Sequence, residues 1–358
     1  MATKNQHFVP RVYLKAWKTK VENKKEPQKQ FDGVYYFKDK AIIGEGITCG
    51  AILWEPHLYT ISFKQLYLAK ECPMVYTFFA NEIHQSMRNN SPQPVYGKLN
   101  YSIIKTKNSV RKHLFDIDDW DFYYDDGTVA RKKALLNRFQ DIHCYILEDA
   151  FISIFESKWD SIFKTFIDEI KNSTPNVSTG NRTISEKSVR EMLEFFFMML
   201  CRSPQFDAMG VYSWIGDILK QNLGDLEETD EMMDAVWFTE LYRMFYKRKG
   251  GFFHTGLAKI MESCQIILFE AYPNAGTFIT SDNPAFQHIS HIETINMNGY
   301  YFPISPEYML FIGKGSAPVN IVDYRMADAK LVKKFNRLIA FYSNKLIVSM
   351  EKNRNKVL

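Results

Sequence analysis

The sequence lacks the short motifs that mark several large enzyme classes. None of the patterns GxGxxG, GxxxxGK[ST], HExxH and GxSxG occurs in its 358 residues. The first two motifs bring backbone N–H groups close to phosphate, and the third holds a zinc ion. Nucleotide-dependent and zincin-type functions therefore lose their usual sequence support.

Cysteine is scarce and does not occur in closely spaced pairs. The chain has five cysteines, an odd number, at wide spacings and with no CxxC pair. This pattern excludes a zinc finger and argues against a disulfide framework. It predicts free, mostly buried thiols in a reducing compartment.

Long apolar runs and a strong net charge are also missing. No stretch approaches the roughly 18 uninterrupted apolar residues of a membrane span, and residues 1–25 are polar and basic rather than signal-like. We therefore expect a cytoplasmic protein without a membrane partner. A net charge of +4 neither demands nor excludes nucleic acid.

What is present is ample apolar material, arranged in distinct zones. The chain is 46% hydrophobic and 15% aromatic, enough for a large packed core. Strand-type runs occur only before about residue 60 and after about residue 264, and helical spacing dominates between them. This predicts one compact α+β domain over residues 1–358, with a mixed sheet formed from the N- and C-terminal strands and a central layer of helices.

The helical portion is predicted over residues 131–250. Apolar residues recur at helical spacing over 131–172, a stretch too long for one straight helix, so we expect a bend or break. A very apolar helix over Met192–Cys201 should follow and end near Pro204, because the residue before proline disfavours helical geometry.

Two motifs near opposite ends of the chain carry a family resemblance. Residues 6–14 read QHFVPRVYL and residues 280–284 read TSDNP. They resemble the "QHYVPRFYL" opening and the "TSDNP" turn of a bacterial family known as domain of unknown function 4238. Three further segments resemble that family in the same order: 54–59 (WEPHLY), 200–204 (LCRSP) and 302–306 (FPISP). The resemblance implies a family without an established activity and marks residues 60–130 as a family-atypical insertion.

The candidate site residues lie in these motifs. In the alternating pattern of residues 6–14, His7 and Arg11 fall on one face, away from the apolar neighbours. His7 is a candidate general base or metal ligand, and a structural histidine is the alternative. Asp282 follows a short strand, where carboxylates often face a cleft, but Asp-Asn-Pro also forms an Asx-turn on its own. Asn283 beside it is a candidate substrate-binding residue.

Arg202 ends the apolar helix and needs a partner. It is a candidate for holding a phosphate or a carboxylate of a substrate. An internal carboxylate, Asp282 or Glu148, would satisfy it equally well. Helical projection puts Glu148 inside the apolar stripe and Glu156 at its edge, so both need partners, either a metal or Arg202.

Two hypotheses of function follow from these residues. In the first, the chain is a hydrolase, namely a metal-dependent nuclease in phage defence or a toxin system. His7, Asp282 and Glu148 would be catalytic, with His7 and Asp282 holding a divalent ion such as Mg²⁺ or Mn²⁺. Arg11, Arg202 and Asn283 would bind a nucleic acid substrate. In the second, the chain is a non-enzymatic binding module with a protein partner or a second copy, and the His/Asp/Arg set is a buried structural network.

Overall fold

The structure, a computed structural model, describes residues 4–23, 25–39, 41–70, 72–177, 180–204, 213–224, 227–247, 250–289 and 297–358. The chain folds into two compact units. The small unit comprises 59–150, and the large unit comprises 4–58 and 151–358. The predicted insertion at 60–130 lies inside the small unit, and its family-atypical character stays a prediction.

The small unit combines a long helix with a three-stranded antiparallel sheet of strand order β8-β7-β9. A second, two-stranded pairing joins β6 to β10. The elements are β6 (Ile61–Ser62), η3 (Phe63–Lys70), α2 (Pro73–Arg88), β7 (Val95–Leu99), β8 (Ser102–Ile104), α3 (Lys107–Lys112), η4 (Leu114–Asp119), β9 (Asp121–Tyr124), α4 (Lys132–Gln140), β10 (His143–Cys144) and α5 (Ile146–Ala150).

The two ends of the chain share a sheet in the large unit, as the sequence predicts. β18 (Leu346–Ser349) pairs antiparallel with β3 (Gln30–Lys38), with Ile347 opposite Phe37. The strand order is β13 (Thr280–Ser281), β18, β3 and β2 (Thr19–Glu22), and β4 (Glu45–Ile47) also pairs with β3. The predictions of an α+β fold and of a sheet shared by the two ends of the chain are therefore confirmed. The expectation that this sheet is mixed is wrong, because all of its strand pairs are antiparallel.

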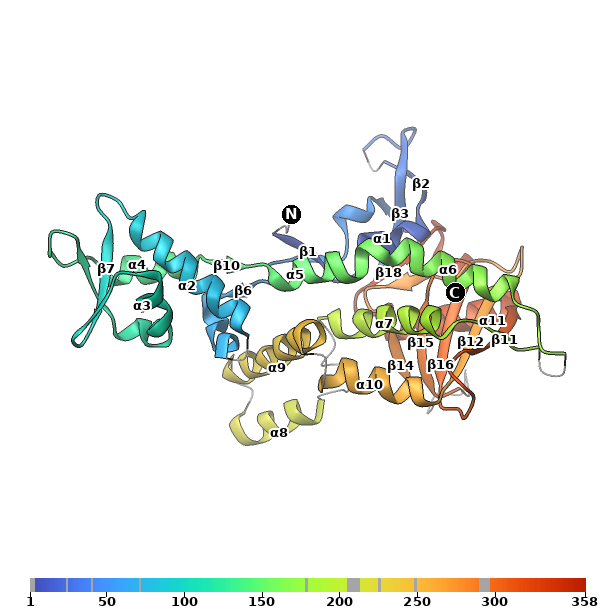
Figure 1. The fold of residues 1–358 in the computed structure, drawn as a ribbon. Coiled ribbons are helices and arrows are strands. Elements are labelled where there is room, and N and C mark those ends of the chain that lie inside the picture. The colour runs from blue at the N-terminus through green and yellow to red at the C-terminus, as the bar shows by residue number, and fades with distance from the viewer. Residues whose placement is uncertain are drawn as a thin grey trace. The chain divides into compact units, whose positions relative to one another are not determined.

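A second sheet lies within the C-terminal part of the large unit (Figure 1). Its order is β11 (Arg182–Thr183), β17 (Ile321–Ala327), β12 (Gln265–Ala271), β16 (Tyr308–Gly313), β15 (Gly299–Pro303) and β14 (Phe286–His288). β12 and β17 run parallel, and the other pairs are antiparallel. The α11 helix (Ala329–Tyr342) contributes Phe335 and Ile339 to the core against this sheet.

The stretch 131–172 is broken, as expected from its length. It contains α4, β10, α5, a π-helical turn η5 (Phe151–Phe155), a 3-10 turn η6 (Glu156–Lys158) and α6 (Trp159–Asn172). The remaining elements are β1 (Asn5–His7), α1 (Arg11–Leu14), η1 (Lys15–Trp17), η2 (Cys49–Ala51), β5 (Trp54–Pro56), α7 (Glu186–Arg202), α8 (Ser213–Leu223), α9 (Glu227–Tyr246), α10 (Gly251–Glu262) and α12 (Arg354–Val357).

The apolar helix predicted over Met192–Cys201 is the second half of α7. Its N-cap is Ser185, whose side chain accepts from the Ser188 N–H at 3.2 Å. The helix ends at Arg202, two residues before Pro204, because proline disfavours helical geometry in the residue that precedes it. Among the described residues, no helix is both long and apolar enough to cross a membrane.

Candidate functional site

The N-terminal motif of the large unit forms a strand and a short helix. β1 pairs antiparallel with β5, with His7 opposite Trp54. Proline at position 10 sits directly before α1, where its missing N–H costs nothing. The segment therefore holds His7 and Arg11 on either side of a fixed turn.

Arg202 is the centre of the interactions around this motif. Its guanidinium is fully buried and donates to Glu156 Oε1 at 2.6 Å. A second nitrogen donates to the backbone carbonyl of His7. The guanidinium carbon also lies 4.5 Å from the ring centre of Phe151, in cation–π geometry. The prediction of an internal carboxylate partner is confirmed, and Glu156 is such a partner.

His7 is held close to this pair as a neutral ring. Burial lowers its pKa to about 4, and the positive charges of Arg11 and Arg202 act in the same direction. A backbone hydrogen bond with Gly50 and the charge of Glu156 oppose the shift. The Nε2 atom is buried and makes no hydrogen bond to any described residue. A base with so low a pKa takes up a proton poorly near pH 7.

The Asp282 carboxylate of the large unit is buried and accepts hydrogen bonds from the backbone of its own chain. The side chain is 3% exposed. Its two oxygens accept backbone N–H groups of Asn344 at 2.8 Å, Lys345 at 2.6 Å and Leu346 at 3.0 Å. Burial raises the pKa of this carboxyl, and the three N–H donors counteract part of that rise. Asp282 thus closes the loop between α11 and β18.

Asn283 is bound to the same loop. It is also 3% exposed, and its Nδ2 donates to the carbonyl of Tyr342 at 3.0 Å. Its backbone N–H donates to Ser281 Oγ at 3.1 Å. The Asp-Asn-Pro turn therefore turns its polar groups towards the end of α11, and no described contact joins it to His7.

The two family-like motifs do meet, through Tyr13 and Thr280, which are not among the candidate site residues. The hydroxyl of Tyr13 lies 2.8 Å from Thr280 Oγ1 and donates to the carbonyl of Pro303 at 2.6 Å. Trp17 Nε1 donates to the carbonyl of Phe278 at 2.8 Å. All these bonds are buried, so the contact is a structural junction.

The predicted catalytic and metal groups do not gather into a ligand set. Glu148 lies in α5 of the small unit and is 5% exposed, whereas His7 and Asp282 belong to the large unit. Among the described residues, no group of three or more His, Cys, Asp or Glu side chains is placed to hold a metal ion. The predicted His7–Asp282 pair therefore gains no further ligand for Mg²⁺ or Mn²⁺, which require several oxygen donors.

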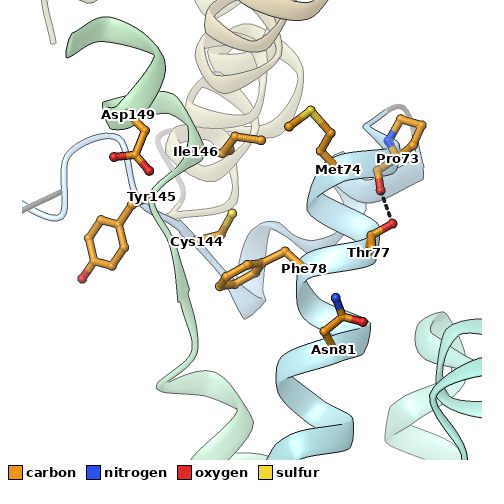
Figure 2. Close-up of a pocket in the computed structure, with 9 residues that line it drawn as sticks. All are labelled: Pro73, Met74, Thr77, Phe78, Asn81, Cys144, Tyr145, Ile146 and Asp149. Atoms are coloured by element: carbon orange, nitrogen blue, oxygen red, sulfur yellow. Dashed lines mark hydrogen bonds between the residues drawn. The ribbon is translucent and has the colours of Figure 1, made fainter. Parts of the chain in front are cut away.

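A hollow on the small unit provides a different kind of candidate site. Its volume is about 900 Å³, within the range of small-molecule sites. It lies between α2 and the segment that runs from β10 into α5. Figure 2 shows Met74 and Phe78 pointing from α2 towards Ile146 and Cys144, whereas Tyr145 and Asp149 point away from α2.

The polar groups of this hollow are few. Thr77 Oγ1 donates to the Pro73 carbonyl at 2.7 Å, as Figure 2 shows, so its donor is used within α2. Asn81 Oδ1 is buried and accepts no hydrogen bond from a described residue. Burial raises the pKa of the Cys144 thiol to about 11, which keeps the thiol protonated and unreactive. The lining thus offers mainly apolar contact and no obvious nucleophile.

The sequence outside the family-like motifs contains a pattern that predicts α2, the helix on one side of this hollow. Val75, Phe79, Ile83 and Met87 recur at intervals of four and form the buried stripe of α2. Pro73 stands at the first turn, where proline favours a helix start. A helix over 73–88 was therefore predictable. Its pairing with β10 was not, because nothing local specifies that contact.

Comparison with known proteins places the chain in one family. The model of the family described as "Protein of unknown function (DUF4238)" matches residues 5–353, so the chain belongs to that family. This confirms the family inferred from the motifs. No curated protein and no solved structure matches the chain. Any function must therefore be inferred from the geometry of the two units.

Proposed function

We propose that this member of the DUF4238 family is a ligand-binding module. Its motif residues would hold the fold together, and an apolar small molecule would occupy the hollow on the small unit. The observation that carries the proposal is that hollow: about 900 Å³, walled by Met74, Phe78 and Ile146. Sites of this size and character commonly bury most of a drug-sized ligand.

The state of the motif residues supports the same proposal. Catalytic groups must reach a substrate, but Arg202, Asp282 and Asn283 are almost fully buried and bond to groups of their own chain. Removing buried charges from water is costly, and each of these interactions offsets that cost. A network of this kind is what a structural role requires.

The ligand chemistry follows from the lining. Apolar side chains such as Met74, Phe78 and Ile146 favour an aliphatic or aromatic body.

The environment-sensitive dye 1-anilinonaphthalene-8-sulfonate tests this proposal. Met74 is exposed on α2, and Met74→Trp would fill the hollow with a larger ring. Met232→Trp is the matched control, because Met232 is an exposed methionine on α9 of the large unit. We expect dye fluorescence to fall with Met74→Trp and to persist with Met232→Trp. Equal dye binding by both variants would exclude this hollow as the site.

A metal-dependent nuclease is the second candidate. Its support is His7 Nε2, a buried nitrogen without a hydrogen-bond partner in the described part of the chain, near the charges of Arg11 and Arg202. Lysines near the N-terminus would guide a nucleic acid to such a site. Two of them, Lys18 and Lys20, pair with Asp32 at 3.2 and 2.8 Å, which reduces their attraction for phosphate. The binding module therefore remains the function that the geometry supports better.

A further inference from the structure

A second hollow lies in the large unit, among four helical segments. Its volume is about 550 Å³, and it is bordered by the η5–η6 turns with the start of α6, and by α7, α9 and α10. The aromatic part of its lining is a cluster of three rings. Phe155 lies 6.0 Å from Phe245 and 6.1 Å from Phe253, measured between ring centres.

Glu194 is the one carboxylate of this hollow without a close partner within the described chain. It is half-buried on α7 and makes no hydrogen bond or ion pair to another described residue. Its neighbour Glu191 differs, because its carboxylate lies 3.9 Å from Lys187 Nζ. A half-buried charge that is not hydrogen-bonded is costly, so Glu194 would gain from a ligand that brings donors.

The pKa of Glu194 agrees with the lack of hydrogen bonds from other described residues to its carboxylate. Burial raises the pKa of its carboxyl, and Glu191 adds to the rise. The positive charges of Arg190 and Lys158 act against it. Burial is the largest influence, so the surrounding charges only partly replace the water that Glu194 loses.

His254 adds a second acceptor to the lining. Its Nε2 lies 3.3 Å from the carbonyl oxygen of Arg243, which can only accept, so Nε2 carries the proton. The other ring nitrogen of the neutral ring is then an acceptor. The ring packs edge-on against Phe253, with 5.0 Å between ring centres, and this fixes its position.

We propose that this hollow binds a small protonated amine with an apolar body. The ammonium group would donate to the Glu194 carboxylate, and the body would pack on Phe155, Phe245 and Phe253. Aromatic faces attract cations within about 6 Å of the ring centre. The three phenylalanine rings and the Glu194 carboxylate therefore both favour a positively charged ligand.

The cations near the hollow do not reverse this preference. Arg190 and Lys158 are exposed, so water and salt screen their charges. Glu194 is half-buried and is screened less. The electrostatic potential beside the aromatic cluster is therefore dominated by the negative charge of Glu194. This site is independent of the hollow on the small unit, and either can fail without the other.

Three ligands that share one phenyl ring and differ in charge test the proposal. Calorimetric titration of the full chain with 2-phenylethylamine, 3-phenylpropionate and 2-phenylethanol would measure their dissociation constants. We expect the amine to bind at least about tenfold more tightly than the other two, a difference of about 1.4 kcal/mol. Tighter or equal binding of the carboxylate would assign the hollow to Arg190 and Lys158 and overturn the proposal. Equal binding of the alcohol, or no binding of the amine, would overturn it as well.

A pair of variants locates the effect at one side chain. Glu194→Gln keeps the shape and removes the charge, so amine affinity should fall at least about tenfold, while the weak affinity for the alcohol stays unchanged. Glu186→Gln is the matched control, because Glu186 is exposed on the same helix outside the hollow, and it should leave the amine affinity within about twofold of wild type. Thermal melting of both variants verifies that they fold. An unchanged amine affinity in Glu194→Gln would contradict the assignment.

Discussion

The buried ion pair of Arg202 and Glu156 is the most constrained interaction around the N-terminal motif. One guanidinium bonds to a carboxylate of the η6 turn and to the carbonyl of His7 in β1. It thereby connects three segments that are far apart in sequence. Such pairs add little net stability when intact, because desolvation offsets the attraction, but breaking one leaves an unpaired buried charge.

Replacing Arg202 by methionine tests this role. Arg202→Met leaves Glu156 and the His7 carbonyl without their donor, and we expect a loss of about 3–5 kcal/mol in the free energy of unfolding. Arg190→Met, at an exposed position of the same helix, should change it by less than about 0.5 kcal/mol. Urea unfolding measures both. A cost under about 1 kcal/mol for Arg202→Met would mean that the pair is not structural.

The His7 ring should make stability depend on pH in a defined window. Its pKa is about 4 in the folded chain, against an ordinary value of 6.5. The unfolded chain therefore binds a proton below pH 6.5, whereas the folded chain does so only near pH 4. The contribution of His7 is fully present above pH 6.5 and is lost as the pH falls towards 4.

His7→Gln removes this titration. We expect the difference in unfolding free energy between wild type and His7→Gln to be constant above pH 6.5. Between pH 6.5 and 4 the wild type should lose stability relative to His7→Gln as the pH falls. Urea unfolding at a series of pH values gives the curve. A difference that does not vary with pH would show that the ring is solvated in the folded state.

The elements at the two ends of the chain depend on one another. β2, β3 and β4 form one sheet with β13 and β18, and α1 and η1 are anchored by Tyr13 and Trp17 to the carbonyls of Pro303 and Phe278. Both aromatic side chains are fully buried. The N-terminal segment is therefore part of the core of the large unit.

Deletion of residues 1–14 should consequently unfold the large unit. The deletion removes β1, the Tyr13 ring and its two hydrogen bonds, together with α1. The milder variant Tyr13→Phe keeps the ring and should cost about 1–3 kcal/mol, because Thr280 and the Pro303 carbonyl lose a buried partner. Circular dichroism melting separates the two. An unchanged melting temperature after the deletion would refute the role of this segment.

Helices and strands were predictable from the sequence where the residues of the element itself specify it. The runs at 265–272, 308–312 and 346–349 have the apolar composition and turn boundaries of strands, and β12, β16 and β18 occupy them. The similar run at 277–280 is a strand only at its last residue, in β13. α11 and the end of α7 were also predictable, since amphipathic spacing and Pro204 specify them. The three-stranded sheet of the small unit was missed, because β9 lies in an acidic, aromatic run that resembles a solvated edge.

The candidate site was harder to predict because its contacts are long-range. An Asx-turn for Asp282 is a local expectation, but its carboxylate binds N–H groups more than 60 residues away. The motif pattern correctly marked residues 6–14 and 280–284 as special. It could not reveal that Tyr13 and Thr280 make the contact between them, since both are ordinary core residues in sequence.

At the scale of the whole molecule, polar motifs and hollows are separated. Arg202, Asp282 and Asn283 of the motifs are enclosed and bonded internally, whereas the two hollows are lined by residues outside the family-like motifs. A scaffold that holds open cavities elsewhere is consistent with a binding module. An enzyme would require the motif residues to face a substrate.

Asp282→Asn is the variant that separates a scaffold role of the motif residues from a catalytic one. It keeps the shape of the side chain but replaces a charged acceptor of three N–H groups. We expect a loss of roughly 2–4 kcal/mol in unfolding free energy, since hydrogen bonds to charged groups contribute about 1.5–3 kcal/mol each and the amide retains part of them.

The decisive measurement combines that unfolding free energy with cleavage of labelled RNA and DNA in Mg²⁺ or Mn²⁺, for wild type and Asp282→Asn side by side. We expect that neither protein cleaves in a metal-dependent way and that the variant is clearly less stable. The opposite result would be metal-dependent cleavage by wild type that disappears in a variant of unchanged stability. That outcome would make Asp282 a catalytic residue and return the protein to the nuclease hypothesis.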